Sequence, residues 1–152
     1  MLVKMAGLCA GAEQCSSDIY DKVIKKGFSR DVADRIVGYL VKNKYIDDAR
    51  YARAYAADKV RFAGWGKIKI RMYLKTKKMT DAIVGQALEY VDAKDYEESL
   101  AKVLSAKARS LDLSDVKDRQ KLYRHLASRG FESSLIIPAI RSHIASYRTL
   151  NP

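Results

Sequence analysis

Seven basic side chains lie between residues 61 and 78, and no acidic side chain lies among them. Like charges that are close in sequence repel one another, and a polyanion would relieve that repulsion. The segment therefore predicts a surface that contacts phosphate groups or acidic side chains, with a solvated helix face as the alternative. Trp65 and Tyr73 lie in the same segment and could stack on bases or pack in the core; for Trp65 we favour the core. The seven are Arg61, Lys67, Lys69, Arg71, Lys75, Lys77 and Lys78.

Residues that could carry out catalysis or bind a metal form no recognisable motif. His125 and His143, the only histidines, have no nucleophile or carboxylate at a motif spacing. The segment 64–66 (Gly-Trp-Gly) follows an expected helix rather than a strand, so it is no phosphate-binding loop. Cys9 and Cys15 form no C-x-x-C pair, and we interpret them as reduced core thiols, with a regulatory disulfide as the alternative. We expect no enzyme activity, no catalytic residue, no metal and no cofactor.

Composition narrows the class of partner. The chain has 152 residues, 48% of them hydrophobic, and a formal net charge of +11. This size suits one compact unit or a short row of small modules, and the charge makes a polyanion the first partner to test. The apolar run at the N-terminus is short and ends at Glu13, and no other run is long enough to span a bilayer. We expect a cytoplasmic protein that contacts no membrane.

The basic segment must be positioned by the elements before and within it. Asp47 or Asp48 can cap a helix that runs to Ala63, and two glycines on either side of Trp65 end it before a second, basic helix. The first helix has a small apolar face that should be buried, flanked by bulkier packing groups. The small residues are Ala49, Ala52, Ala56, Val60 and Ala63, and the bulkier ones are Tyr51, Tyr55 and Phe62.

A repeat decides the predicted architecture. Three blocks of sequence beginning at residues 19, 70 and 122 align without a gap, so they are offset by 51 and then 52 residues. Apolar anchors recur at the first, fifth, tenth, fourteenth and eighteenth position of each block, which is typical of repeat proteins. They are Ile19, Val23, Phe28, Val32 and Ile36, then Ile70, Leu74, Met79, Ile83 and Ala87, then Leu122, Leu126, Phe131, Leu135 and Ala139.

Each block predicts a helix, a tight turn and a second helix. Gly27 and Gly130 suit a left-handed turn residue, whereas the middle block has Lys78 there, so either that turn differs or the lysine has another role. A further helix precedes each pair, at 2–12, 48–63 and 96–110. Pro138 predicts that the last helix starts late or kinks. The fold expected is all-α, an elongated solenoid of three tandem three-helix repeats at residues 1–46, 47–94 and 95–152.

The motifs DDARYARAYAADK, GWGKIKI and HLASRGF, in this order over the repeats, resemble the RecX family of recombination regulators. The resemblance covers nearly the whole chain. It implies a monomeric bacterial protein that binds the RecA recombinase filament in its groove and restrains strand exchange, ATP hydrolysis and co-protease activity. It also implies contact with DNA, single- or double-stranded, without sequence specificity.

The third repeat departs from this pattern. It has no glycine-tryptophan turn, and three acids lie at 112–118, so basic contact there should begin only at Arg119, Lys121 and Arg124. In the middle repeat, helical spacing predicts a single contact stripe of Lys67, Arg71, Lys75 and Lys78. Two other functions stay open. One is a helix-turn-helix protein that binds DNA without regulating a filament, and the other is a helical scaffold for an acidic protein.

Overall fold

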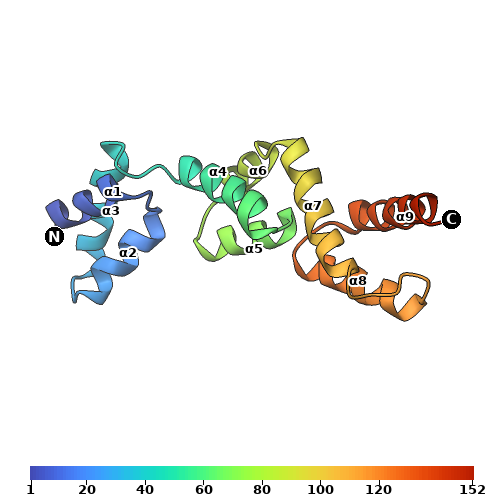
Figure 1. Cartoon of the computed structure of the whole chain (residues 1–152). Coiled ribbons are helices and arrows are strands. Elements are labelled where there is room, and N and C mark those ends of the chain that lie inside the picture. Colours follow the sequence, from blue (N-terminus) through green and yellow to red (C-terminus); the bar gives the residue numbers. More distant parts are fainter. The chain divides into compact units, whose positions relative to one another are not determined.

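A computed structural model describes all 152 residues, and every regular element in it is a helix (Figure 1). The predicted all-α fold of tandem three-helix repeats is confirmed. The first repeat contains α1 (Leu2–Gly11), α2 (Ser16–Lys25) and α3 (Arg30–Lys42). The second contains α4 (Asp48–Asp58) with a π-helical turn (Lys59–Ala63), α5 (Lys67–Thr76) and α6 (Asp81–Glu89). The third contains α7 (Ala93–Ala108), α8 (Val116–Ser128) and α9 (Ser133–Leu150).

The helices pack into two compact units whose limits cut across the repeats. Unit 1 consists of Met1–Tyr55 and Leu74–Ala87, and unit 2 of Ala56–Tyr73 and Leu88–Pro152. The helices α4, α5 and α6 therefore each contribute residues to both units. Unit 1 has a core of buried apolar residues from the first repeat and the segment that follows it. These are Met5, Ile19, Val23, Ala33, Ile36, Leu40 and Ile46.

The repeat anchors are largely buried, with one change of register. The first two anchors of every block have at most 1% of their surface exposed. Of the predicted fourth anchors, Val32 and Ile83 are half-buried, and the prediction for Leu135 is wrong, since Leu135 is 43% exposed whereas Ile136 beside it is fully buried. The same shift makes Ala33 and Val84 the buried residues of their blocks. The reason is where the second helix begins, because in each block its fourth residue, three positions after the first, faces the core.

The turns inside the three blocks share one backbone conformation. The φ angles of Gly27, Lys78 and Gly130 are 87°, 57° and 94°, all in the left-handed region. The middle turn therefore does not differ, and Lys78 occupies a conformation that glycine adopts with less strain. Thr80 then receives a hydrogen bond from the amide of Ile83 (3.2 Å) and caps the helix that follows.

Two adjacent carboxylates begin α4 and serve two different helices. Asp47 caps α4 itself, accepting a hydrogen bond from the amide of Arg50 at 3.0 Å. Asp48 accepts one from the amide of Ser16 at 2.8 Å and so caps α2, which has no side-chain cap of its own. These bonds tie the start of the second repeat to the first within unit 1.

The small apolar face of α4 is buried as predicted at Ala52, Ala56 and Val60. The prediction for Phe62 is wrong, since its side chain is 83% exposed. Phe62 lies in the π-helical turn, where the wider coil changes the direction of each side chain relative to an α-helix. The turn ends at Gly64, which has a φ of 64°.

The last helix starts early. It begins at Ser133, directly after Glu132, so the predicted late start is wrong, and the helix continues through Pro138. Proline cannot donate to the carbonyl of Ser134, four residues before it, but Ser134 is exposed, so water can solvate that carbonyl.

At the other end of the chain, Cys15 is buried, Cys9 is half-buried, and neither forms a disulfide.

No helix of the chain combines the length and the apolar character needed to cross a membrane. No group of three or more histidine, cysteine or acidic side chains is placed to hold a metal ion.

Candidate functional site

The first turn of α5 is held by three hydrogen bonds within unit 2. The amides of Gly66 and Ile68 donate to the carbonyl oxygens of Arg129 and Gly130, at 2.7 and 3.0 Å. The amide of Lys67 donates to the hydroxyl of Tyr96 at 2.9 Å. Amides that a helix start leaves without a partner in its own helix are thus satisfied by the third repeat. The direction of α5 in unit 2 is fixed by these bonds.

Glycine is needed on both sides of this contact. A Cβ added to Gly66 would overlap the backbone of Gly130, and one added to Gly130 would overlap Lys69. The guanidinium of Arg129 also donates to the carbonyl of Gly64 at 3.3 Å and to that of Ala63, and so satisfies the end of the π-helical turn. We name this contact between residues 63–69 and 129–131 the turn–turn lock. The sequence motifs GWGKIKI and SRGF contain both halves, but no sequence rule pairs them.

Tyr96 contacts both halves of the turn–turn lock. Its side chain is 5% exposed, its ring packs edge-on against Phe131 with centroids 5.5 Å apart, and its hydroxyl donates to Glu132 at 2.8 Å. Burial raises the pKa of the Tyr96 hydroxyl, and the bond to Glu132 adds to this, so the hydroxyl stays a donor. The start of α5 is therefore built on a rigid, apolar support.

Three cations of α5 in unit 2 have no carboxylate partner, namely Lys67, Lys69 and Arg71, which we call the unpaired α5 cations. The ammonium of Lys69 lies 4.5 Å from the centre of the Trp65 ring, and that of Lys67 lies 5.0 Å from the centre of the Tyr96 ring. An aromatic face attracts a cation without cancelling its charge. Two of these lysines lie in the first turn of α5, which has no acidic residue and is already the positive end of the helix dipole.

Trp65 is half-buried and forms part of the same surface. Its ring meets Tyr73 edge-on at 6.2 Å, and the ammonium of Lys59 lies 4.8 Å from its centre, on the α4 side of the turn. The prediction that Trp65 lies in the core is therefore only partly met. Its ring packs against Tyr73 and also contacts two lysines at the surface.

Three of the other predicted cations of this segment form ion pairs, and two of the three acids lie far away in sequence. Arg61 donates to Asp95 at 2.7 Å in unit 2, and Asp95 raises the pKa of the guanidinium. In unit 1, Lys75 and Lys77 pair with Asp81 and Asp18, each at 2.7 Å. Residues 61–78 contain no acid, but acids from other parts of the sequence lie beside three of their cations.

The pair of Lys77 and Asp18 is the most sheltered of these, with 24% and 27% of the side chains exposed. Burial of Asp18 opposes its ionisation, but hydrogen bonds from Lys77 and Cys15 hold the pKa of Asp18 below its ordinary value. Lys78 has a ring rather than an acid nearby, with its ammonium 6.0 Å from the centre of Tyr20.

The predicted stripe is shorter in the structure. Lys67, Arg71 and Lys75 lie along α5 at helical spacing, but α5 ends at Thr76. Lys78 follows that end in a left-handed conformation, so it does not continue the helical row.

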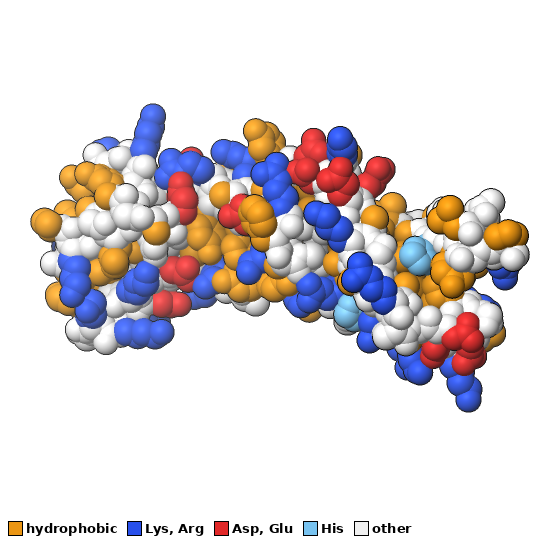
Figure 2. All heavy atoms as spheres, in the orientation of Figure 1, with side chains coloured by type: hydrophobic (Ala, Val, Ile, Leu, Met, Phe, Trp, Pro, Cys, Tyr) orange, Lys and Arg blue, Asp and Glu red, His pale blue; other side chains and the backbone are white.

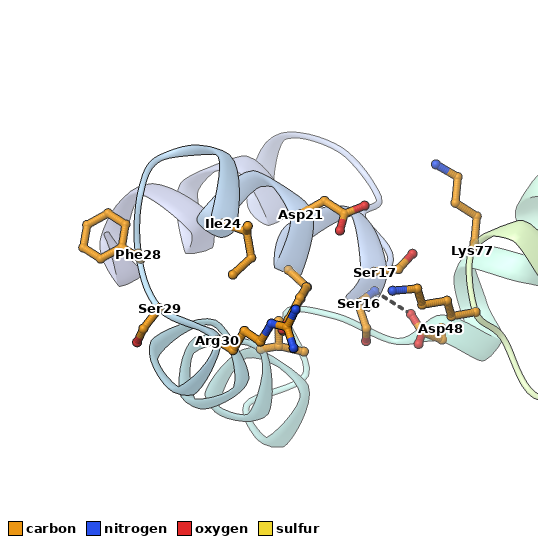
Figure 3. Close-up of a pocket in the computed structure, with 12 residues that line it drawn as sticks. Ser16, Ser17, Asp21, Ile24, Phe28, Ser29, Arg30, Asp48 and Lys77 are labelled. Carbon is orange, nitrogen blue, oxygen red and sulfur yellow. Dashed lines mark hydrogen bonds between the residues drawn. The ribbon is translucent and has the colours of Figure 1, made fainter.

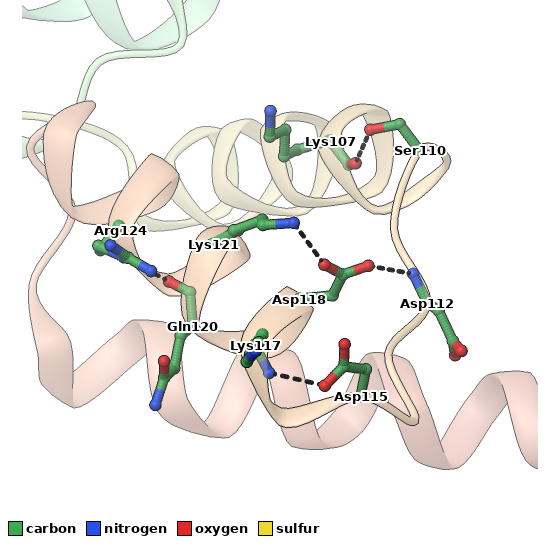
Figure 4. A network of polar contacts seen from close by, with 9 residues as sticks. All are labelled: Lys107, Ser110, Asp112, Asp115, Lys117, Asp118, Gln120, Lys121 and Arg124. Carbon is green, nitrogen blue, oxygen red and sulfur yellow. Dashed lines mark hydrogen bonds and ion pairs between the residues drawn. The ribbon is translucent and has the colours of Figure 1, made fainter.

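The predicted cations of the third repeat bond within that repeat, and Figure 4 shows the contacts of Lys121 and Arg124. Arg119 donates to the carbonyls of Leu113 and Ser114 at 2.8 and 3.0 Å, and Lys121 pairs with Asp118 at 2.8 Å. The side chain of Arg124 bonds weakly to a carbonyl one turn earlier, at 3.4 Å. Of these three cations only Lys121 is paired with a carboxylate.

Lysine and arginine side chains spread over much of the visible face, whereas acidic side chains gather in a few clusters (Figure 2). Exposed apolar side chains accompany the cations on α5, where Ile68 is 47% and Met72 is 67% exposed. Spacing alone did not identify these two residues, because their positions also fit a packing face.

Comparison with known proteins identifies a family for the second and third repeats. A family model described as the second three-helix domain of RecX matches residues 47–88, and one described as the third three-helix domain matches residues 95–140. The chain belongs to the RecX family. The matched ranges fall within the second and third predicted repeats of this RecX chain.

Individual RecX relatives are distant. The regulatory protein RecX of Clostridium tetani is 30% identical over 117 residues, which are 74% of this chain and 53% of its own. That of Vibrio campbellii is 26% identical over 123 residues, 81% of this chain and 78% of its own. The chain spans little more than half the length of the clostridial relatives it matches.

Solved structures share the fold. A crystal structure of a regulatory protein RecX superposes with a TM-score of 0.81 at 22% identity, covering 93% of this chain and 70% of that one. The crystal structure of RecX from Lactobacillus salivarius superposes with a TM-score of 0.78 at 19% identity, covering 93% and 95%. At this identity the likeness concerns the fold.

Proposed function

We propose that this chain is a non-catalytic regulator that binds the RecA recombinase filament and restrains its strand exchange, ATP hydrolysis and co-protease activity. It acts in the cytoplasm as a monomer and also contacts DNA without reading sequence. Family membership and the name of the relatives, regulatory protein, support this function. The observation that carries it is the set of unpaired α5 cations at the positive end of their helix.

The charge of this surface fits a polyanion. Lys67, Lys69 and Arg71 repel one another and the helix dipole, and no carboxylate of the chain offsets them. The amides at the helix start are already bonded, so an anion would meet the side chains and the dipole rather than free N–H groups. Such contacts recognise phosphates by charge and carry no base specificity. A filament that contains DNA offers both phosphates and acidic side chains.

The test is charge reversal. A triple variant Lys67→Glu, Lys69→Glu and Arg71→Glu should keep its helical circular dichroism, because none of the three side chains forms an ion pair and a charge at the protein surface contributes little to stability. We expect binding to a RecA filament assembled on single-stranded DNA to fall by at least about tenfold. A tenfold loss corresponds to about 1.4 kcal/mol, which the loss of three contacts together can supply. For single-stranded DNA alone, the slope of log affinity against log salt should flatten by about two units, at about 0.7 per phosphate.

The matched control is a triple variant with the same charge change elsewhere in unit 2, at Lys102, Lys117 and Arg141, which are exposed and form no ion pair. It should bind both partners nearly as the parent does. Equal losses in the two variants would show that net charge alone matters. A parent that binds DNA but no filament would favour a plain DNA-binding protein.

A further inference from the structure

Two turns of the chain have the same sequence pattern and the same backbone. Lys26-Gly27-Phe28 and Arg129-Gly130-Phe131 each end the second helix of a repeat with a base, a left-handed glycine and a phenylalanine. The φ angles of the two glycines are 87° and 94°. In both turns the glycine amide also donates to the carbonyl three residues before it, at 2.9 and 3.0 Å. The amide of Phe131 donates in addition to the carbonyl of Leu126 at 3.3 Å, whereas the amide of Phe28 makes no corresponding bond. The two turns are therefore alike at the glycine, and they differ in this closing bond and in what lies against them.

The third-repeat turn is covered. Its two carbonyl oxygens, on Arg129 and Gly130, accept hydrogen bonds from the amides of Gly66 and Ile68 in the turn–turn lock. Its phenylalanine, Phe131, is 1% exposed. The occupant of this turn is a segment in which one helix ends, a glycine bends the chain, and the next helix begins.

The first-repeat turn is open. A Cβ built on Gly27 would meet no atom within 4 Å, and the side chain of Phe28 is 41% exposed. The carbonyl oxygens of Lys26 and Gly27, which correspond to the two acceptors of the lock, receive no hydrogen bond from another segment. An apolar anchor that is buried in the other two repeats is thus uncovered here, since Met79 at the same position is 3% exposed.

A groove of about 810 Å³ lies beside Phe28 within unit 1 (Figure 3). Ile24, Phe28 and Val37 supply apolar lining, and Arg30 and Lys78 are cations with no carboxylate partner. Asp48 and Lys77 also line it, but both are bonded within the unit. The single remaining acid is Asp21, so the groove keeps a surplus of positive charge.

We infer that the turn at residues 26–28 and its groove bind a helix start of a partner protein. The partner segment has the chemistry of residues 63–69, with a glycine before the helix and amides that donate to Lys26 and Gly27. It also places an apolar side chain on Phe28 and an acidic one near Arg30 and Lys78. A second copy of the chain is not the occupant, because its own segment 63–69 is held by its third-repeat turn. The inference rests on the proposed function, so the partner is the protein of the filament.

The experiment compares Phe28→Glu with Tyr45→Glu. Both residues belong to unit 1, both are 41% exposed, and both substitutions add the same charge. Binding is measured to a RecA filament on single-stranded DNA, and separately to that DNA alone. Phe28→Glu should weaken filament binding by about tenfold or more, as loss of a central apolar contact does. It should leave DNA binding within about twofold of the parent, and Tyr45→Glu should change neither.

The outcomes separate the two claims. Filament binding by Phe28→Glu equal to that of the parent overturns the docking site and leaves the proposed function intact. An equal loss on DNA alone overturns it too, because the turn would then contact nucleic acid. Self-association of the parent that Phe28→Glu abolishes in sedimentation would assign the groove to a second copy instead. A parent that does not bind the filament contradicts the proposed function itself, and this inference falls with it.

Discussion

The first-repeat turn at residues 26–28 and the third-repeat turn at 129–131 start from one motif and reach opposite environments. In the third repeat the glycine lies under the backbone of residues 66–69, and the phenylalanine packs on Tyr96. In the first repeat the same glycine faces open space and the phenylalanine is 41% exposed. The left-handed glycine therefore forms the turn in both places. Whether the turn is buried in the fold or open to a partner depends on the segment that lies beside it.

The largest expected effect is the loss of the covered phenylalanine. Phe131→Ala should destabilise unit 2 by about 3 to 5 kcal/mol, because it leaves a cavity under Tyr96. Phe28→Ala removes a side chain that is already 41% exposed and should cost less, about 1 to 2 kcal/mol. Urea unfolding measures both, with Trp65, the only tryptophan, as the fluorescence reporter of unit 2 and circular dichroism for the whole chain. Equal losses would mean that the two turns are not in different environments.

Alanine substitution of the two turn glycines should give a smaller difference in unfolding free energy between the two turns. Gly27→Ala should cost about 1 to 2 kcal/mol, the strain of a left-handed residue with a Cβ. Gly130→Ala carries the same strain and adds about 1 to 3 kcal/mol, because its Cβ would overlap Lys69. Both substitutions introduce the same left-handed strain, so the difference between their losses of unfolding free energy in urea measures the overlap with Lys69 alone. A difference near zero would contradict the turn–turn lock.

The smallest effect is a pH dependence that only the covered turn should show. Burial, followed by the charges of Lys107 and Arg129, lowers the pKa of His125. The unfolded chain therefore takes up the proton first, so the contribution of His125 to stability is complete above about pH 6.5 and is lost as the pH falls toward the folded pKa. Thermal unfolding at pH 7.5 and 5.5, followed by Trp65 fluorescence, should show this loss in the parent and less of it in His125→Gln.

A control for the pH effect is present in the first repeat. The residue aligned with His125 in the first repeat is Lys22, so that repeat has no histidine at this position. Asp18, whose pKa is lowered, acts at much lower pH, below about 4, and does not overlap with the histidine window. Identical pH profiles of the parent and His125→Gln would remove the histidine from the account.

Much of the fold followed from local patterns. Apolar spacing located all three blocks, and the glycines at 27 and 130 predicted the left-handed turns in the first and third. The fourth anchor was displaced by one residue because a helix start is set by its cap and not by the apolar pattern. The exposure of Phe62 was missed because a π-helical turn shifts side-chain directions, and no residue pattern announces such a turn.

The candidate site was less accessible from sequence. Its cations could be listed from the sequence, but Lys77 pairs with Asp18, 59 residues away, and Arg61 with Asp95, 34 residues away. Whether a charge is neutralised depends on such distant partners, which spacing cannot supply. The open first-repeat turn was also invisible, because the sequences of both turns are nearly the same and only the three-dimensional neighbours differ.

The most direct test of the central claim is the ATP hydrolysis of RecA filaments on single-stranded DNA, measured as this protein is added. A regulator that binds the filament should lower the rate at amounts well below one copy per filament subunit, and the triple variant of Lys67, Lys69 and Arg71 should need a much higher concentration for the same effect. A rate that stays constant until the added protein is abundant enough to compete for the DNA itself would contradict the account.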